Sequence, residues 1–179
     1  MQTSRSTIQI CARGALAVAL FIVASLARDA RAATATSNFT VTGNVVANCT
    51  ISTAGITFSY DPVVANAAAN ATATGTVTIA CTKGSAPTIG LNAGANSAAA
   101  GGLTPPAPRA MRLGATANYL GYDIYWPGTT TSWTTAAPYL PAAPGSKAPR
   151  TFNMDGVAFA GQDVTVGTYT DTVTATVNF

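Results

Sequence analysis

The feature that most constrains the fold of this chain is an alternation of apolar and polar residues that recurs between turn-forming residues. In the closing stretch GTYTDTVTATVNF, residues 167–179, apolar or aromatic side chains alternate with Thr and Asn. A period of two is typical of a half-buried β-strand, whose successive side chains point to opposite faces. The pattern predicts a strand at residues 164–179 with one inward-facing row, made of Tyr169, Val173, Ala175, Val177 and Phe179.

Similar patterns predict further strands, each rich in β-branched or aromatic residues. No stretch after residue 33 has a convincing helical period, and Asn and Thr interrupt the Ala-rich residues 63–75, which favours a loop or a strand lead-in there. Short strands separated by Gly, Pro and Asn indicate an antiparallel β-sandwich. The further strands are predicted at residues 39–46, 49–52, 56–60, 75–82, 88–92, 110–113, 119–126 and 152–159.

Two Pro-rich stretches, residues 102–110 and 138–149, cannot join a central ladder because Pro lacks an N–H group. We interpret them as surface loops between strands. A domain boundary is the alternative, but the thirty or so residues that follow the second stretch are too few for an independent core. The sequence therefore predicts one folded domain.

The first residues predict a secretory signal peptide, residues 1–32. Arg5 and Arg13 supply the positive region, residues 14–27 the apolar core, and Ala-Arg-Ala at 30–32 a cleavage site between Ala32 and Ala33. The apolar run is about fourteen residues long, whereas a membrane-spanning helix needs roughly twenty. We expect an exported mature chain that begins at Ala33 and retains no membrane span.

The charges of the mature chain balance, with five Lys or Arg against five Asp. No basic cluster is present that could bind phosphate groups, so the sequence gives no support to nucleic-acid binding. The charged residues are Lys83, Arg109, Arg112, Lys147 and Arg150 on one side and Asp61, Asp123, Asp155, Asp163 and Asp171 on the other.

Two cysteines follow the predicted signal peptide, Cys49 and Cys81. In an exported chain such a pair predicts a disulfide. Closing this loop should stabilise the fold by roughly 3–4 kcal/mol in the chain-entropy model. Metal binding is the competing use of the two thiols, but the chain has no His and the mature part has no other Cys, so a soft metal ion would lack ligands.

The sequence offers little for catalysis, because it contains neither His nor Glu. General acid–base chemistry would depend on five Asp that lie far apart along the chain. No nucleophile motif, Cys–His pair or phosphate-binding loop is present. We predict no catalytic, cofactor-binding or metal site, and the open alternative is a pair of Asp that folding brings together.

Aromatic residues concentrate in NYLGYDIYW, residues 118–126, with Trp133 shortly after. The row that contains Leu120, Tyr122, Ile124 and Trp126 has the character of a core face. An exposed platform that stacks on sugar rings is the alternative interpretation of the same aromatic residues.

The N-terminal part of the mature chain repeats the alternation of the closing stretch. Phe39, Val41, Gly43 and Val45 alternate with polar residues. An immunoglobulin-like sandwich that lacks one edge strand leaves an apolar groove, which a strand from another chain can fill. The alternative is that residues 39–46 form the ordinary first strand of a complete sandwich.

Several stretches, taken in order, resemble the spore coat protein U domain family, which is shared with pilin subunits of archaic chaperone–usher pili. The resemblance covers essentially all of residues 33–179. It rests on FTVTGNVVANCTI (39–51), FSYDP (58–62), ATATGTVTIACT (71–82), IGLNAGAN (89–96), NYLGYDIYW (118–126) and the closing GTYTDTVTATVNF.

This resemblance implies an all-β, incomplete immunoglobulin-like β-sandwich that is completed by a donor strand from another chain. Residues 33–46 correspond to the donor segment, with Phe39, Val41, Gly43 and Val45 as donor positions, and residues 47–179 to the pilin domain. The implied partners are a periplasmic chaperone, an outer-membrane usher and other pilin subunits. The chaperone is implied to grip the carboxylate at Phe179, and the row of Tyr169, Val173, Ala175 and Val177 to line the groove.

We therefore expect a structural subunit of a cell-surface fibre that serves attachment and biofilm formation and is secreted through the periplasm. A spore-coat or extracellular matrix protein is the first alternative, and it could use the same strand exchange. The second alternative is a monomeric, secreted carbohydrate-binding module built on the aromatic cluster.

Overall fold

The computed structural model describes residues 32–179, so the predicted signal peptide lies outside the described residues except for Ala32. The chain divides into two units, with the boundary between Gly43 and Asn44. The described part of the first unit contains neither helix nor strand, and Ala32 and Ala33 are exposed there. The second unit, Asn44–Phe179, contains all the regular structure that is described below.

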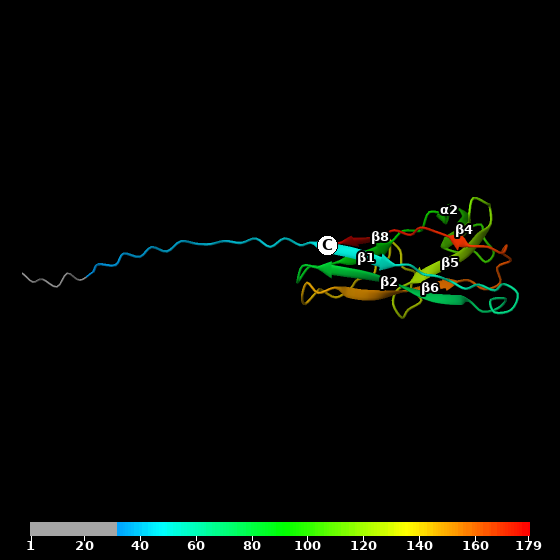
Figure 1. Cartoon of the computed structure of the whole chain (residues 1–179), viewed down its shortest axis with the longest axis horizontal. Helices are drawn as coiled ribbons and strands as arrows, with labels where there is room; N and C mark the ends of the chain where they lie inside the picture. Colours follow the sequence, from blue (N-terminus) through cyan, green and yellow to red (C-terminus); the bar gives the residue numbers. More distant parts are fainter. Residues whose placement is uncertain (1–31) are drawn as a thin grey trace, which may run out of the picture. The chain divides into compact units, whose positions relative to one another are not determined.

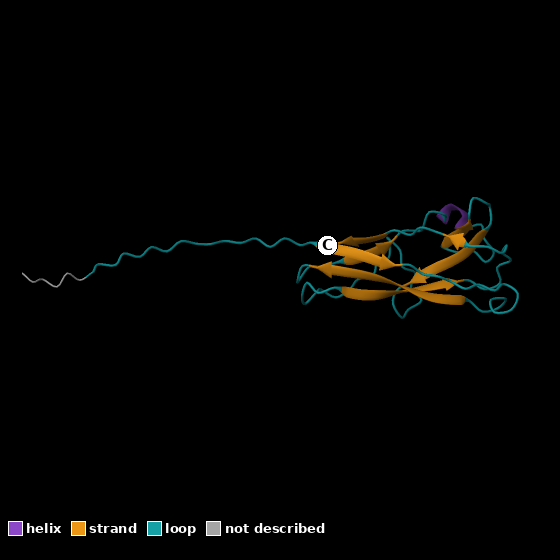
Figure 2. Cartoon of the chain, in the orientation of Figure 1, coloured by secondary structure: helices purple, strands orange, loops and turns teal. Residues whose placement is uncertain are grey.

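The second unit is built from two antiparallel sheets, as Figures 1 and 2 show. A four-residue helix, α2 (Ser97–Ala100), lies in the connection that leads to β4. The larger sheet has the order β1 (Cys49–Ala54), β2 (Ala71–Cys81), β6 (Arg150–Ala158), β5 (Tyr119–Tyr125), β4 (Arg109–Leu113) and β7 (Tyr169–Thr170), and the smaller one pairs β3 (Thr88–Leu91) with β8 (Ala175–Asn178).

The core forms where the apolar faces of these strands meet. In β2 the buried residues Val77, Ile79 and Cys81 alternate with half-buried Thr and Ala, as the period of two predicts. Ile89 of β3 joins the same cluster, and Trp133 is fully buried with its indole N–H donating to the Ile89 carbonyl oxygen at 2.6 Å. The prediction of an all-β sandwich is confirmed.

Strand β5 is buried on both of its faces. Leu120, Tyr122 and Ile124 are buried, which agrees with their predicted place in the core. Gly121 in the other row is buried as well, because the Gln162 side chain bonds both its N–H, at 2.6 Å, and its carbonyl oxygen, at 2.9 Å.

A buried ion pair that the sequence did not predict crosses from β4 to β5. The Arg109 guanidinium bonds the Asp123 carboxylate, and each side chain is almost completely buried. Arg109 also donates to the carbonyl oxygens of Trp133, at 2.6 Å, and Asn92, at 3.0 Å. Hydrogen bonds in several directions compensate for the removal of both charges from water.

Three predicted strands are wrong or incomplete. Residues 39–46 and 56–60 are not regular strands, and the predicted strand at 164–179 is reduced to β7 and β8. A strand is defined by its pairing, and an alternating pattern fixes the preferred backbone conformation without supplying a partner. The short helix α2 was not predicted either, since four residues are too few to show a period.

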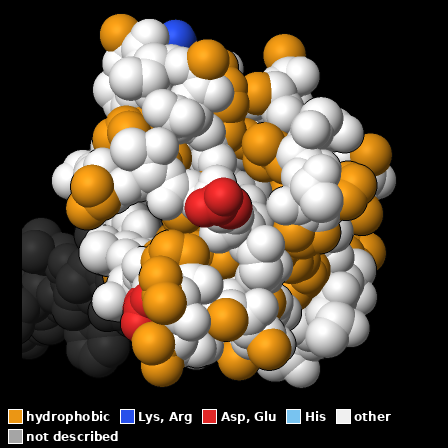
Figure 3. Space-filling model, turned by 90° about the vertical axis from the view of Figure 1, so that its right-hand side faces the viewer, with side chains coloured by type: hydrophobic (Ala, Val, Ile, Leu, Met, Phe, Trp, Pro, Cys, Tyr) orange, Lys and Arg blue, Asp and Glu red, His pale blue; other side chains and the backbone are white. Residues whose placement is uncertain are grey.

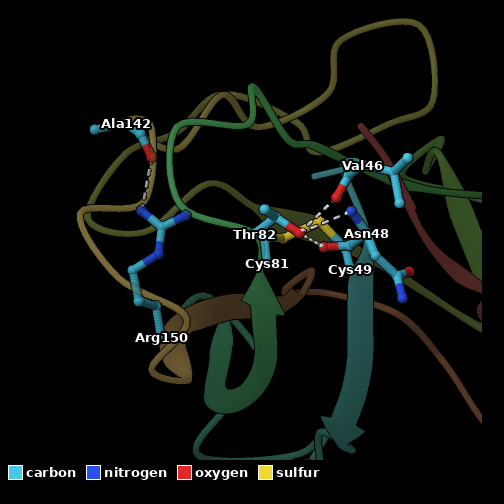
Figure 4. The surroundings of a disulfide bond; sticks show 7 residues. All are labelled: Val46, Asn48, Cys49, Cys81, Thr82, Ala142 and Arg150. Carbon is cyan, nitrogen blue, oxygen red and sulfur yellow. Dashed lines mark hydrogen bonds between the residues drawn. A yellow bond between two sulfur atoms is a disulfide. The ribbon is translucent and has the colours of Figure 1, made fainter. Parts of the chain in front are cut away.

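The predicted disulfide between Cys49 and Cys81 is confirmed. It joins the first residue of β1 to the last residue of β2, which face each other in the ladder. Next to it, the Thr82 hydroxyl accepts from the Asn48 N–H at 3.0 Å and donates to the Val46 carbonyl oxygen at 3.3 Å (Figure 4). The point where the chain enters this unit is therefore tied to the end of β2.

Candidate strand-binding groove

A cavity of about 880 Å³ lies between two extended segments of the second unit. We call it the groove. Residues 53–62 border it on one side and residues 164–175 on the other. Its remaining lining residues come from the sheets and are Leu91, Met111, Leu120, Tyr122, Ile124 and Met154.

The first border follows β1 and is attached to the core by side chains. Ile56, Phe58 and Tyr60 are half-buried, whereas the residues between them are exposed. The Tyr60 hydroxyl donates to the Phe159 carbonyl oxygen at 2.8 Å and accepts from the Gln162 N–H at 3.1 Å. The alternation predicted for residues 56–60 is present, although no strand pairing accompanies it.

A glycine in β6 allows this border to lie directly on the sheet. A Cβ atom at Gly156 would be 2.8 Å from both Ile56 Cγ2 and Phe58 Cζ. Phe58 packs beyond it against the Tyr122 ring, with 6.1 Å between ring centroids. Any side chain at position 156 would push the border outward, so Gly156 sets the depth of this side of the groove.

The second border is bonded along one backbone edge. After β7, the carbonyl oxygens of Thr172 and Thr174 accept from the N–H groups of Ala95, at 3.1 Å, and Asn92, at 3.0 Å, and β8 then pairs with β3. In an antiparallel ladder, alternate residues direct their N–H and C=O groups to opposite edges. Val173 and Ala175 therefore direct theirs to the edge that β3 does not occupy.

A carboxylate inside the groove connects this border to the loop after β3. Asp171 accepts hydrogen bonds from the N–H of Ala95, at 2.9 Å, from the Asn96 side-chain amide, at 3.0 Å, and from the Tyr122 hydroxyl, at 2.7 Å. Burial, followed by the bond to Asp171, raises the pKa of Tyr122. The pair therefore consists of a neutral phenol that donates to a carboxylate, an arrangement that holds the border in place.

The predicted groove residues fall in two places. Tyr169, Val173 and Ala175 line the groove, whereas Val177 lies opposite Ile89 in the ladder between β8 and β3. Phe179 is 52% exposed. The border at residues 53–62 was missed as part of a site, although the alternation at 56–60 was the signal that could have identified it.

The predicted donor residues lie on both sides of the boundary between the units. Phe39, Val41 and Val45 are 86%, 82% and 83% exposed, and Gly43 is exposed too. Exposed large apolar side chains in a regular alternation are unusual on a folded surface. They offer one apolar face for binding.

Within residues 32–179, no three His, Cys, Asp or Glu residues are placed so that they could hold a metal ion. No helix in the same part of the chain is long and apolar enough to cross a membrane. What the groove offers is an apolar base and a free backbone edge, and these are the features that an added β-strand uses.

Comparison with known proteins agrees with this description. The family model of the Spore Coat Protein U domain matches residues 35–176. Protein U of Myxococcus xanthus is 40% identical over 164 residues, which cover 84% of this chain and 88% of that protein.

Among solved structures, the chain resembles one from the CsuC–CsuE complex of Acinetobacter baumannii, a pre-assembly complex between a chaperone and a tip adhesion subunit of archaic chaperone–usher Csu pili. The TM-score is 0.54 with 22% sequence identity, and the match covers 75% of this chain but only 40% of that one. This likeness shows the shared fold, and the family match carries the assignment. The chain belongs to the Spore Coat Protein U domain family.

Proposed function

We propose that this chain is a structural subunit of an extracellular fibre, in which the N-terminal segment of one copy fills the groove of the next. The observation that carries the proposal is the groove with its free backbone edge at Val173 and Ala175. The segment at residues 39–45 has the complementary form, an alternating row without a partner strand among the described residues.

The expected energetics are sufficient for a stable joint. Burying Phe39, Val41 and Val45 contributes roughly 1.5–3 kcal/mol for each side chain. Main-chain hydrogen bonds to the free edge add about 1 kcal/mol each. Gly43, which has no side chain, suits the shallowest part of the groove.

Assembly of this kind needs partners that keep the groove covered until a strand arrives. An exposed apolar groove beside an unpaired edge promotes aggregation. We propose that a periplasmic chaperone covers the groove, contacting β8 and the C-terminal residue Phe179, and that an outer-membrane usher exchanges the chaperone for the next subunit. The fibre would then stand on the cell surface and serve attachment and biofilm formation, and the subunit would have no catalytic role.

The family description favours a second candidate, a spore-coat or extracellular matrix protein. The same strand exchange would build either assembly, so the two candidates differ in where the polymer is deposited. The third interpretation, a sugar-binding platform, loses support because Trp133 is 0% exposed and Trp126 packs against Tyr139 with its ring edge-on.

The test is binding of a synthetic peptide of residues 33–46 to a chain that begins at Asn44. We expect tight binding, and a Phe39→Ala peptide should bind roughly 30- to 150-fold more weakly, the equivalent of about 2–3 kcal/mol. The matched control is Thr40→Ala, which changes the opposite row and should alter the affinity less than about threefold. Equal weakening by the two substitutions would show that the alternating row does not enter a groove.

A further inference from the structure

The exposed charged side chains of the second unit are segregated between its two ends, with Lys83 and Lys147 at one end and Asp61 and Asp163 at the other. Strand β2 separates these ends by eleven residues, or roughly 35 Å at about 3.3 Å per residue. One end is where the chain enters the unit at Asn44, and the other is where the groove is bordered by Pro62 and Val164.

The entry end is basic. Lys83 follows Thr82, which holds the entering residues Val46 and Asn48, and both Lys83 and Lys147 are exposed. The loops that carry the two lysines are joined by a bond from the Gly84 N–H to the Pro144 carbonyl oxygen at 3.0 Å. Arg150 adds a third charge at this end, with its guanidinium bonded to the Ala142 carbonyl oxygen at 2.6 Å (Figure 4). We call Lys83, Lys147 and Arg150 the basic root.

The opposite end is acidic at the mouth of the groove. Asp61 and Asp163 are both exposed, and each directly precedes a residue that lines the groove, Pro62 and Val164. Hydrogen bonds from the N–H groups of Val63 and Val64 lower the pKa of Asp61, so its carboxylate is charged at neutral pH. We call Asp61 and Asp163 the acidic mouth.

Apolar side chains and one further cation accompany these charges. Val63 and Val64 are exposed beside the acidic mouth, and Val46 and Leu140 are exposed at the basic end. Figure 3 shows the end on the right of Figure 1, where acidic side chains lie among hydrophobic ones. Arg112 belongs to this end too, but its guanidinium is bonded to the carbonyl oxygens of the turn at residues 115–116.

We infer that the basic root of one copy docks against the acidic mouth of the next. The inference rests on the proposed function and adds a second contact to the strand in the groove. A donor segment that leaves the basic root and enters at the acidic mouth brings opposite charges together, whereas entry from the other end would place two basic roots face to face. The charges thus favour entry of the donor segment at the acidic mouth. They also accelerate the encounter of two subunits.

Growth of fibres from the full mature chain, residues 33–179, tests the inference by light scattering. At low ionic strength, K83E/K147E should grow roughly tenfold more slowly than the wild type, and D163K should be slowed as well. Adding D163K to K83E/K147E should restore growth to within about threefold. The differences should vanish near 1 M salt, where the Debye length is about 3 Å. The charge-retaining control K83R/K147R should grow like the wild type.

The donor peptide separates this inference from the proposed function. A peptide of residues 33–46 has no charged side chain, so it should cap the growth of wild type and K83E/K147E at the same concentration. Failure of the peptide to cap any variant would contradict the proposed function. The docking of the basic root on the acidic mouth would be overturned by a different result. In that result the peptide caps growth, and wild type, K83E/K147E and D163K grow equally fast at low salt. Urea unfolding shows whether each variant folds. If K83E/K147E does not fold, the growth rate of D163K at low salt tests the docking of the basic root on the acidic mouth.

Discussion

Replacing Asp171 by Ala should loosen the second border of the groove. The Asp171 carboxylate accepts hydrogen bonds from the Ala95 N–H, the Asn96 side chain and the Tyr122 hydroxyl, at 2.9, 3.0 and 2.7 Å. These bonds link residues 164–175 to the loop after β3 and to β5. No other side chain among the described residues has this combination of partners.

The magnitude follows from the kind of bonds that are lost. A hydrogen bond to a charged group contributes about 1.5–3 kcal/mol, but the losses do not add in full where water can replace the carboxylate. Asp171 is half-buried and lines the groove, so water can reach part of the site. We expect Asp171→Ala to lower the free energy of unfolding by roughly 3 kcal/mol, and Asp171→Asn, which keeps one acceptor oxygen, by about 1 kcal/mol.

Urea unfolding of the mature chain at one fixed protein concentration measures these changes. The midpoint should fall in the order wild type, Asp171→Asn, Asp171→Ala, with an unchanged slope. Thr172→Ala, an exposed neighbour on the same segment, is the matched control and should stay within about 0.5 kcal/mol. An Asp171→Ala midpoint equal to that of Thr172→Ala would refute the role assigned to this carboxylate.

Three other predictions concern the disulfide, the buried phenol and the N-terminal segment. Replacing both Cys49 and Cys81 by Ala should cost about 3–4 kcal/mol of unfolding free energy, and reduction of the wild type should give the same shift in urea. Because its pKa is raised, folded Tyr122 keeps a proton that the unfolded chain releases, so the contribution of Tyr122 to stability should be constant below about pH 10 and fall above it by roughly 1.4 kcal/mol per pH unit. Tyr122→Phe should reduce this slope, leaving a smaller contribution from Tyr125, whose pKa burial also raises; an unchanged slope would contradict the assignment. Deleting residues 33–42 should leave a chain that accepts a strand but cannot donate one, so it should cap growing fibres, and fibre growth from the truncated chain alone would rule out the donor segment.

The sequence predicted well those elements whose signal is local. The alternation of Val77 and Ile79 with Thr identifies β2. Each residue of a central strand has a cross-strand neighbour on both sides, and these pairs stabilise the alternating arrangement. Cys49 and Cys81 were predictable as a disulfide because the sequence predicts export, and an exported chain has few other uses for such a pair.

The polar contacts of the interior could not be predicted, because their partners meet only after the chain has folded. Arg109 and Asp123 carry no periodic signal, and their pairing depends on the register between β4 and β5. The same holds for Gln162, which bonds Gly121 across 41 residues of sequence. Arg109 begins β4, Gln162 lies in a loop and Asp123 lies within β5; a polar residue at such a position predicts exposure, whereas the fold buries it.

The predicted strands that failed share a physical feature. Residues 39–46, 56–60 and 171–174 alternate in the manner of a strand, yet none of them is a strand in the structure. The last two border the groove, and the first is the proposed donor. An alternating pattern is favourable only where a neighbouring strand and an apolar face stabilise it. If the three segments complete one ladder between two copies, the alternating pattern in the sequence describes the assembled fibre. A single chain can form only those strands whose pairing partners lie within the same chain.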